Sequence, residues 1–254
     1  MTEKPSILDH PMITGSYFFP RDTAPERVFP IRSGDITLAC VHHVIDHNAS
    51  TVIHFHGNGE TVADYVPHMA RTFAEFGLNS LFVEYRGYGK STGTPGLVVQ
   101  LDDVDAVLAA IRVPPERLLV FGRSIGSLYA IEFAHRHPEI SGLILESAIA
   151  DVLERILLRV SPRDLDVPYD TLRDAVMEHF DHESKLEGFE KPLLILHARH
   201  DHLVDVSHAQ RLYDWSSSYQ KRLTLFDAGD HNTIQAANKA EYLRALRLFC
   251  ALHG

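Results

Sequence analysis

The stretch Gly122-Arg123-Ser124-Ile125-Gly126 decides the fold that we expect for this chain. It has the pattern G-x-S-x-G, which places a serine in a sharp turn between a strand and a helix. The apolar run Leu118 to Phe121 before it has the length of a buried strand, and small residues recur at four-residue spacing after it. Glycine on both sides of the serine suits a turn with a crowded backbone. The stretch therefore predicts a reactive hydroxyl at Ser124; the alternative is a serine that only caps a helix.

Strands and helices alternate on both sides of this turn. Residues 27–31 and 36–45 flank a turn signal and predict a β-hairpin. Further apolar runs of strand length are separated by segments of helical periodicity, and these runs are 51–56, 81–85, 118–121, 140–145, 193–197 and 222–226. The alternation predicts an α/β fold with a mainly parallel, doubly wound sheet, and we expect residues 1–254 to form a single domain.

Two helical stretches are irregular within this alternation of strands and helices. The apolar positions from Val62 to Phe76 predict a helix in which Pro67 marks the start of the regular part. Between the runs 140–145 and 193–197 the alternation pauses, and two helical stripes predict a small cap insertion at about 148–190. We expect Leu153 and Leu157 of this cap to line an apolar pocket for short to medium acyl groups above Ser124.

Composition excludes several classes of protein. The hydrophobic content of 45% and the charged content of 23% are typical of an ordinary globular protein. A formal charge of −10 argues against nucleic-acid partners. The start of the chain, Met1 to Pro11, lacks the pattern of a secretory signal, and the two cysteines, Cys40 and Cys250, form no disulfide framework. We therefore expect a cytoplasmic protein without a stable membrane anchor.

A serine nucleophile needs a base and a group that orients the base. His231 lies in a loop between the last expected strand and the last expected helix, and we assign it as the base. Asp201 follows the strand that ends at residue 197, which gives the chain order Ser, Asp, His that accompanies this turn. Asp205 is the competing acid. Asp230 is set aside because adjacent residues in a turn do not face one another.

The oxyanion of the reaction needs hydrogen-bond donors. We expect them to be the backbone N–H of Ile125 and that of Asn58, which lies in a glycine-rich loop after the strand 51–56. The alternative is that this loop is a plain turn. Of the 17 histidines, His54 with His56, or His197 with His200 and His202, are the candidates for a metal site. No paired carboxylates accompany them, so we expect no metal and no cofactor.

Four runs of the sequence resemble one known superfamily. These runs are His56 to Gly59, Tyr85 to Ser91, Gly122 to Gly126 and Gly229 to Asn232. Over residues 26–252 the chain resembles the α/β-hydrolase superfamily, and in particular the branch with eukaryotic protein depalmitoylases and their bacterial relatives. The resemblance implies the α/β-hydrolase fold and a triad of Ser124, Asp201 and His231. The cysteine cluster through which the depalmitoylases attach to membranes has no counterpart here, because no cysteine precedes Cys40.

Taken together, these features predict a cofactor-free serine hydrolase. It would cleave carboxylic esters or thioesters in a small-molecule or acyl-ester substrate through an acyl-enzyme intermediate. Two alternatives remain. A serine peptidase would use the same triad but needs a means to recognise a peptide, and a non-catalytic binding protein would not require Ser124, Asp201 and His231 to be retained together.

Overall fold

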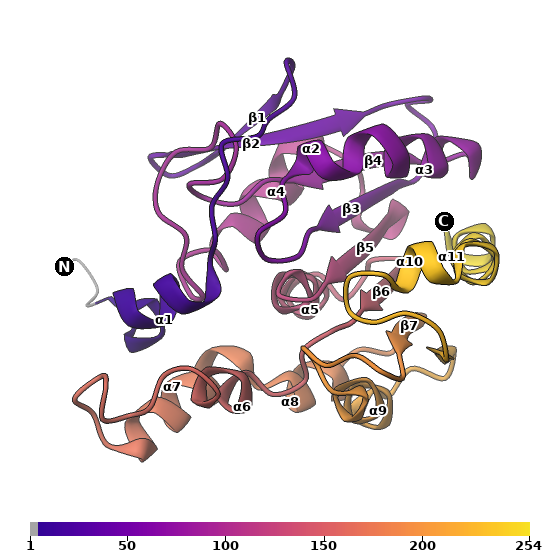
Figure 1. Cartoon of the computed structure of the whole chain (residues 1–254). Helices are drawn as coiled ribbons and strands as arrows, with labels where there is room; N and C mark the ends of the chain where they lie inside the picture. Colours follow the sequence, from indigo (N-terminus) through magenta and orange to yellow (C-terminus); the bar gives the residue numbers. More distant parts are fainter. Residues whose placement is uncertain (1–4) are drawn as a thin grey trace.

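The strands of the sheet follow the order β1-β2-β4-β3-β5-β6-β7-β8 in the computed structural model, which describes residues 5–254 (Figure 1). Their bounds are β1 (Phe29–Ser33), β2 (Ile36–His43), β3 (Thr51–Phe55), β4 (Asn79–Val83), β5 (Leu118–Arg123), β6 (Gly142–Glu146), β7 (Leu193–Ala198) and β8 (Lys221–Phe226). Strands β3 to β8 pair in the parallel sense, whereas β2 is antiparallel to both β1 and β4. The predicted hairpin and the mainly parallel sheet are confirmed.

Helices occupy most of the connections between these strands. They are η1 (Ile7–Asp9), α1 (Pro11–Tyr17), α2 (Val62–Tyr65), η2 (Val66–Ala70), α3 (Arg71–Glu75), α4 (Asp103–Ile111), η3 (Pro115–Arg117), α5 (Gly126–Arg136), α6 (Val152–Leu157), α7 (Tyr169–Phe180), α8 (His182–Glu187), α9 (Val206–Trp215), α10 (Ile234–Ala237) and α11 (Lys239–His253). Within residues 5–254, none of them combines the length and the apolar character needed to cross a membrane.

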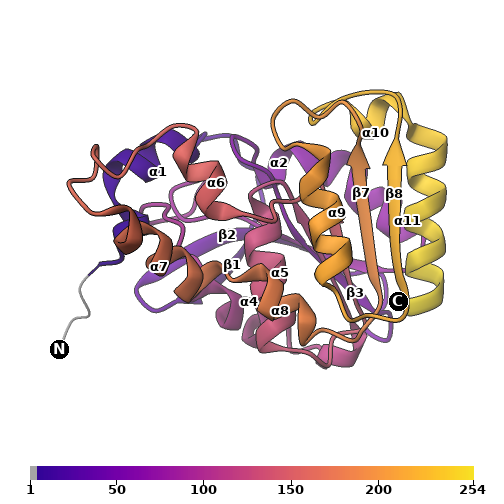
Figure 2. The same ribbon diagram turned by 90° about the horizontal axis from the view of Figure 1, so that it is seen from below.

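Helices cover both faces of the sheet, because successive side chains of a strand point to opposite faces. In β5, Val120 belongs to one apolar cluster, while Leu119 and Phe121 belong to the other. The first cluster includes residues of α4, α5 and α9, and the second includes residues of α2, α3 and α11. Figure 2 shows α9 and α11 on opposite sides of β7 and β8. The central strands are therefore buried on both faces, as in a doubly wound sheet.

The helix after β3 passes through a π-helical turn at a proline. Segments α2, η2 and α3 follow one another without a gap, and Pro67 lies inside η2, the π-helical part. Proline has no N–H to donate, and an i to i+5 turn accommodates this local break in the hydrogen-bond ladder. The helix begins at Val62, before the proline, so the prediction that Pro67 marks the start of the regular part is wrong.

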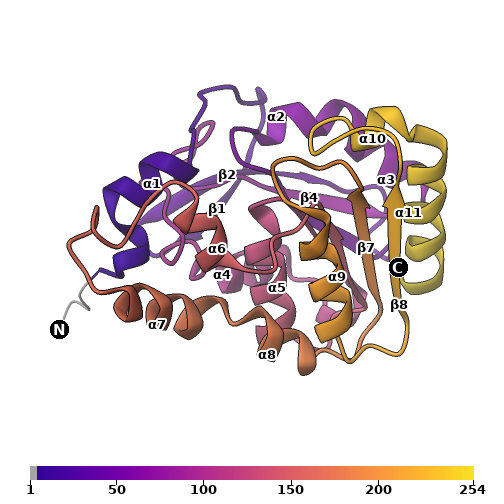
Figure 3. The same ribbon diagram turned by 60° about the horizontal axis from the view of Figure 1, so that its bottom comes forward.

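Three helices lie between β6 and β7, where the sequence predicted two. The first two, α6 and α7, were expected; α6 lies beside α1 in Figure 3, and α7 packs against η1. The third, α8, begins after Asp181, whose carboxylate accepts a hydrogen bond from the Ser184 N–H at 3.1 Å. This helix has six residues, and only His182 and Leu186 are buried, so its apolar periodicity is too short to detect.

The segment before β1 contains α1, a helix that the sequence analysis did not predict. Pro11 occupies the first position of α1, where its fixed φ and its missing N–H suit a helix start. The Nδ1 atom of His10 accepts a hydrogen bond from the Met12 N–H at 3.3 Å. This helix brings Tyr17 next to the carboxyl ends of the parallel strands.

His182 links α8 to the segment that follows β6. Its Nδ1 donates to the carbonyl oxygens of Ile149 and Ala150 at 3.0 and 3.2 Å, and the side chain is buried. Burial, assisted by the charge of Lys185, lowers the pKa of His182 from 6.5 to about 4, although the two carbonyl groups oppose this shift. The folded protein therefore holds His182 in its neutral form.

This burial predicts an acid-sensitive stability. Between pH 6.5 and about 4 the unfolded chain binds a proton at this histidine and the folded protein does not, so the free energy of unfolding falls as the pH falls through this window. The contribution of His182 is roughly 3 kcal/mol. We expect His182→Asn, which keeps a donor near Nδ1 but does not titrate, to flatten the dependence of stability on pH in urea titrations from pH 4 to 7. His135→Asn, at an exposed position of α5, is the control. Equal slopes for wild type and His182→Asn would contradict this prediction.

Candidate active site

Ser124 lies in a strained turn between β5 and α5. Its φ is 52°, in the left-handed region that residues with a Cβ rarely adopt. A Cβ at Gly122 would lie 2.6 Å from the Cβ of Ala130, and a Cβ at Gly126 would lie 2.6 Å from the carbonyl oxygen of His56. Both glycines are therefore required by the close approach of backbone segments, and the turn directs Ser124 away from the sheet.

Three predicted residues meet at the carboxyl ends of the strands. His231 follows β8 and Asp201 follows β7. The Nε2 atom of His231 lies 2.9 Å from Ser124 Oγ, and its Nδ1 lies 2.7 Å from Asp201 Oδ2. All three side chains are buried, with 8% or less of each residue exposed. The structure thus forms one line of hydrogen bonds from the serine to the carboxylate.

The surroundings of Asp201 favour its charged form. Burial by itself raises the pKa of this carboxyl group, but the hydrogen bond and charge of His231 outweigh burial and lower it. The other carboxylate oxygen, Oδ1, accepts hydrogen bonds from the N–H groups of Leu203 and Val204 at 2.9 and 2.8 Å. His197, at 3.5 Å, adds a further favourable contact. The carboxylate is therefore fixed in position as well as charged.

The two other acids considered from the sequence have different partners. Asp205 caps α9, since its carboxylate accepts a hydrogen bond from the Ser207 N–H at 2.9 Å. Asp230 accepts hydrogen bonds from the N–H groups of Asn232 and Thr233, each at 3.0 Å. Neither carboxylate contacts the ring of His231, in agreement with the choice of Asp201.

The two predicted oxyanion donors both border the cavity beside Ser124. In the described part of the chain, the N–H groups of Asn58 and Ile125 donate to no other protein group. The side-chain oxygen of Asn58 accepts hydrogen bonds from the Phe19 N–H and the Tyr88 hydroxyl, each at 3.1 Å. These bonds fix the loop after β3 while leaving two backbone donors free at the cavity.

His56 stabilises the same loop through its contact with Glu84. Its Nε2 lies 2.8 Å from the Glu84 carboxylate, whose second oxygen accepts from the Val62 N–H at 3.1 Å. His54 contacts a different set of aromatic rings, those of Tyr65, Phe82 and Phe121, whereas His56 contacts those of Tyr85 and Tyr88. The two histidines do not face one site, because β3 ends at Phe55 between them. Within residues 5–254, no group of three or more potential ligand side chains is arranged to hold a metal ion.

Arg123, the residue before the serine, is a buried cation with two carboxylate partners. It contacts Glu60 at 2.6 Å and Glu146 at 3.0 Å, and it donates to the carbonyl oxygen of His231 at 2.8 Å. Burial acts to lower the pKa of Arg123, but Tyr65, Glu60 and Glu146 raise it further than burial lowers it. This residue was not predicted, since only its position within the G-x-S-x-G pattern distinguishes it.

A cavity of about 220 Å³ lies beside Ser124 and is lined by residues at the ends of β3, β5, β7 and β8. Tyr17 and Phe19 line it from the segment before β1, and Ile149, Arg155 and Arg159 line it from the segment after β6. The sequence analysis missed both contributions. The four-residue spacing of Arg155 and Arg159 in the sequence was the available signal for a charged face, although α6 ends at Leu157, before Arg159.

Leu153 and Leu157 do not line this cavity. Leu153 packs against the main apolar cluster, and 38% of Leu157 is exposed. Residues two positions apart on a helix point to nearly opposite sides, so a helix that turns Arg155 towards the cavity turns both leucines away from it. The structure therefore places a charged side chain of α6, and not its apolar stripe, at the cavity.

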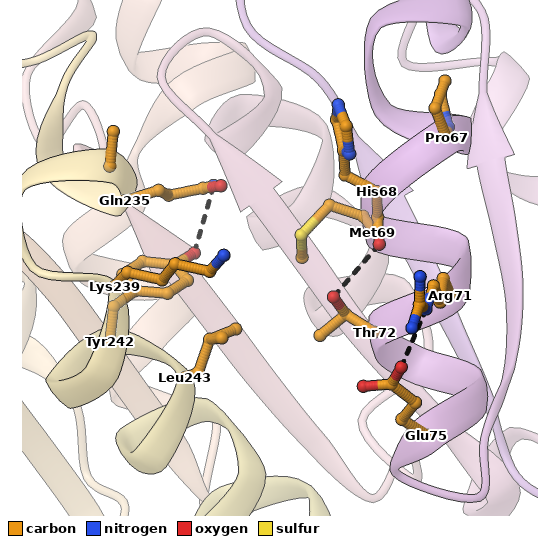
Figure 4. A pocket seen from close by; sticks show the side chains of 11 residues that line it. Pro67, His68, Met69, Arg71, Thr72, Glu75, Gln235, Lys239, Tyr242 and Leu243 are labelled. Carbon is orange, nitrogen blue, oxygen red and sulfur yellow. Dashed lines mark hydrogen bonds and ion pairs between the residues drawn. The ribbon is translucent and has the colours of Figure 1, made fainter.

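A wider hollow of about 610 Å³ lies away from Ser124, between residues 67–75 and 235–243 (Figure 4). Its polar groups bind one another: Arg71 pairs with Glu75 at 2.9 Å, and the Thr72 hydroxyl donates to the His68 carbonyl at 3.0 Å. No base accompanies the Thr72 hydroxyl in the way that His231 accompanies Ser124. The smaller cavity is therefore the candidate active site.

The chain is similar in sequence to known hydrolase families and proteins. The family model Hydrolase_4, described as serine aminopeptidase S33, matches residues 46–165. Uncharacterized protein YfhR of Escherichia coli K12 is 30% identical over 195 residues, which are 73% of this chain and 64% of that protein. Alpha/beta hydrolase domain-containing protein 17C of Mus musculus is 28% identical over 203 residues, 78% of this chain and 59% of that protein. The chain thus spans less than two thirds of the length of these relatives.

Solved structures share the fold. Est1E from Butyrivibrio proteoclasticus, determined with ferulic acid bound, has a TM-score of 0.74 and 18% identity, covering 89% of this chain and 98% of its own. The Pyrococcus furiosus esterase Pf2001 has a TM-score of 0.69 and 20% identity, covering 93% and 98%. The sheet order, the turn at Ser124 and these similarities together show that the chain has the α/β-hydrolase fold and is similar to proteins of the α/β-hydrolase superfamily.

Proposed function

We propose that this protein is a serine hydrolase that cleaves carboxylic esters or thioesters through an acyl-enzyme on Ser124. The observation that carries the proposal is the line of hydrogen bonds from Ser124 Oγ through His231 to Asp201, at 2.9 and 2.7 Å. A charged Asp201 holds the His231 tautomer in which Nδ1 carries the proton. Nε2 is then free to accept the proton of the serine.

The reaction follows from this arrangement. Ser124 Oγ bonds to the substrate carbonyl carbon while His231 Nε2 takes the hydroxyl proton, and the carbonyl oxygen becomes an oxyanion. The free N–H groups of Ile125 and Asn58 supply the donors for that charge. The alcohol or thiol leaves with the proton from His231. Water then attacks the acyl-enzyme with His231 as the base, which releases the carboxylic acid and restores the serine.

Cleavage of peptides from their amino terminus is the second candidate, because the matching family model is described as serine aminopeptidase. Such an enzyme must bind a substrate ammonium group, for which a carboxylate is the usual partner. Among residues 5–254, those that line the cavity include Arg123, Arg155 and Arg159 but no aspartate or glutamate. The charge of the cavity therefore favours a small ester or thioester over a peptide amine.

The two cysteines of the protein, Cys40 and Cys250, are buried free thiols, which suit a reducing compartment. We therefore also propose a cytoplasmic location.

The first test removes the nucleophile. Ser124→Ala should abolish labelling by a fluorophosphonate probe and should lower kcat on 4-nitrophenyl acetate by about 10⁴-fold or more. The control is Ser141→Ala, since the Ser141 hydroxyl donates to the Leu118 carbonyl at the opposite end of β5. That variant should label like wild type. Retention of a tenth of the wild-type activity in Ser124→Ala would exclude Ser124 as the nucleophile.

The second test separates the two acids. Asp201→Asn should lower kcat by about 10⁴-fold, because an amide at this position favours the wrong tautomer of His231. Asp205→Asn should leave kcat nearly unchanged and cost about 1 kcal/mol of stability at most, because it alters only the cap of α9. Steady-state kinetics and urea titrations measure the two effects. If Asp205→Asn were the slower enzyme, the assignment of the acid would be wrong.

Arg123 positions the loop that carries His231. Its guanidinium donates to the His231 carbonyl oxygen and is neutralised by Glu60 and Glu146, so it connects the base to β5 and β6. Glu146 is buried and Glu60 is partly exposed. A buried cation with such partners is costly to disrupt, because removing one member leaves the others uncompensated. We propose that Arg123 acts through His231 and does not touch the substrate carbonyl.

The third test replaces this cation. Arg123→Met should lower the free energy of unfolding by about 3–5 kcal/mol. It should also slow fluorophosphonate labelling at a temperature where the variant remains folded, and Arg123→Lys should restore part of that rate. The matched control is Arg71→Met, which removes an exposed pair with Glu75 and should change neither quantity appreciably. A destabilised Arg123→Met that labels at the wild-type rate would show that Arg123 is structural only.

A further inference from the structure

Arg155 is a half-buried cation at the cavity with no anionic partner in the described chain. It lines the cavity beside Ser124 from α6. Its backbone carbonyl accepts a hydrogen bond from the Tyr17 hydroxyl, but its guanidinium takes part in no hydrogen bond or ion pair within residues 5–254. The neighbouring Glu154 binds Arg211 and faces His208 instead. The guanidinium of Arg155 therefore lies at the cavity and joins no two elements of the described chain through a hydrogen bond or ion pair.

The other two arginines of the cavity are engaged. Arg123 is paired with Glu60 and Glu146. Arg159 donates to the Ser16 carbonyl oxygen, and its guanidinium lies over the ring of Tyr17 at 5.0 Å. Both therefore stabilise the walls of the cavity. Arg155 is the one of the three whose donors remain available to a bound molecule.

The surroundings of Arg155 disfavour its positive charge unless an anion lies beside it. Burial lowers the pKa of Arg155, and the nearby charge of Arg159 adds to this effect, although Tyr17, Glu154 and Asp201 oppose it. A guanidinium nevertheless stays protonated in proteins. An anion beside Arg155 would compensate for the hydration that the guanidinium loses on burial, whereas an apolar acyl chain there would bury an unpaired charge.

We propose that the substrate of this site carries, besides the bond to be cleaved, a free carboxylate that binds Arg155. This inference rests on the proposed function, since it names the substrate class of the same serine hydrolase. A carboxylate matches the guanidinium, because two parallel N–H groups can bind its two oxygens. The cavity of about 220 Å³ is smaller than most ligand pockets, which indicates a short chain between the carboxylate and the reacting carbonyl.

The proposal replaces the apolar acyl pocket that the sequence suggested. Val152 and Ile156 of α6 are buried in the core, and Leu153 packs there too. These apolar residues hold the helix in place, and its Arg155 lines the same cavity as Ser124 and His231. The selectivity of the site then depends on charge more than on the length of an apolar chain.

The test compares two esters of the same acid. One is 4-nitrophenyl hydrogen adipate, which carries a free carboxylate, and the other is methyl 4-nitrophenyl adipate, in which that carboxylate is masked. Release of 4-nitrophenol gives kcat/KM for each. We expect wild type to prefer the anionic ester by about tenfold or more, because a charge-assisted hydrogen bond contributes that much. The preference should shrink as NaCl is added.

Variants assign the preference to Arg155. Arg155→Met should abolish the preference for the anionic ester, and Arg155→Lys should keep part of it. The control is Arg173→Met on α7, which removes one positive charge paired with Asp170 and Asp174 outside the cavity and should keep the wild-type ratio. Fluorophosphonate labelling and thermal melting establish that each variant is folded.

The outcomes distinguish a failure of the proposed hydrolase function from a failure of the inference about Arg155. If neither ester is cleaved and Ser124 is not labelled, the proposed function itself fails. If both esters are cleaved at similar kcat/KM, or if Arg155→Met keeps the wild-type ratio, the protein is a hydrolase but Arg155 does not select an anionic substrate. A loss of the preference in Arg155→Met alone supports the inference.

Discussion

The buried charge of Arg123 is the constraint on which the site depends. A guanidinium removed from water must have its partners at fixed positions, and these partners come from three parts of the chain: Glu60 after β3, Glu146 at the end of β6, and the loop of His231 after β8. Glu146 is in turn hydrogen-bonded to Gln235 at 3.0 Å and to Tyr242. One cation beside Ser124 thus connects the loops after β3 and β8 to the end of β6.

The proposed chemistry and the proposed selectivity depend on different parts of the molecule. Ser124, Asp201 and His231 lie at the ends of parallel strands, which the two-sided core holds rigid. The wall of the cavity, by contrast, forms where α1 meets α6, through the Tyr17 hydroxyl on the Arg155 carbonyl and Arg159 on the Ser16 carbonyl. Substitutions in that wall can change the preferred substrate without disturbing the strand ends.

The sequence predicts what local patterns determine, and much of this site is local. The G-x-S-x-G turn, the alternation of strands and helices, and the position of His231 after the last strand all follow from spacing within short segments. The side of α6 that meets the cavity does not, because it depends on how distant segments pack. The apolar stripe correctly marked a helix at α6, yet its leucines lie against the core or in solvent, and Arg155 lines the cavity beside Ser124. Helices α1 and α8 were missed because they are short.

The two proposals make different demands on binding energy. A carboxylate held by Arg155 is present before, during and after the attack of Ser124, so its interaction stabilises the bound substrate and the transition state alike. Such an interaction raises kcat/KM for molecules that carry the charge and contributes little to kcat itself. The donors at Ile125 and Asn58 act differently, since the oxyanion that they meet exists only while the tetrahedral intermediate lasts. Under these proposals, the permanent charge of the substrate carboxylate would bind at the helical wall and determine which substrate is preferred. The transient charge of the oxyanion would bind at the rigid strand ends, where its stabilisation raises the rate of the reaction.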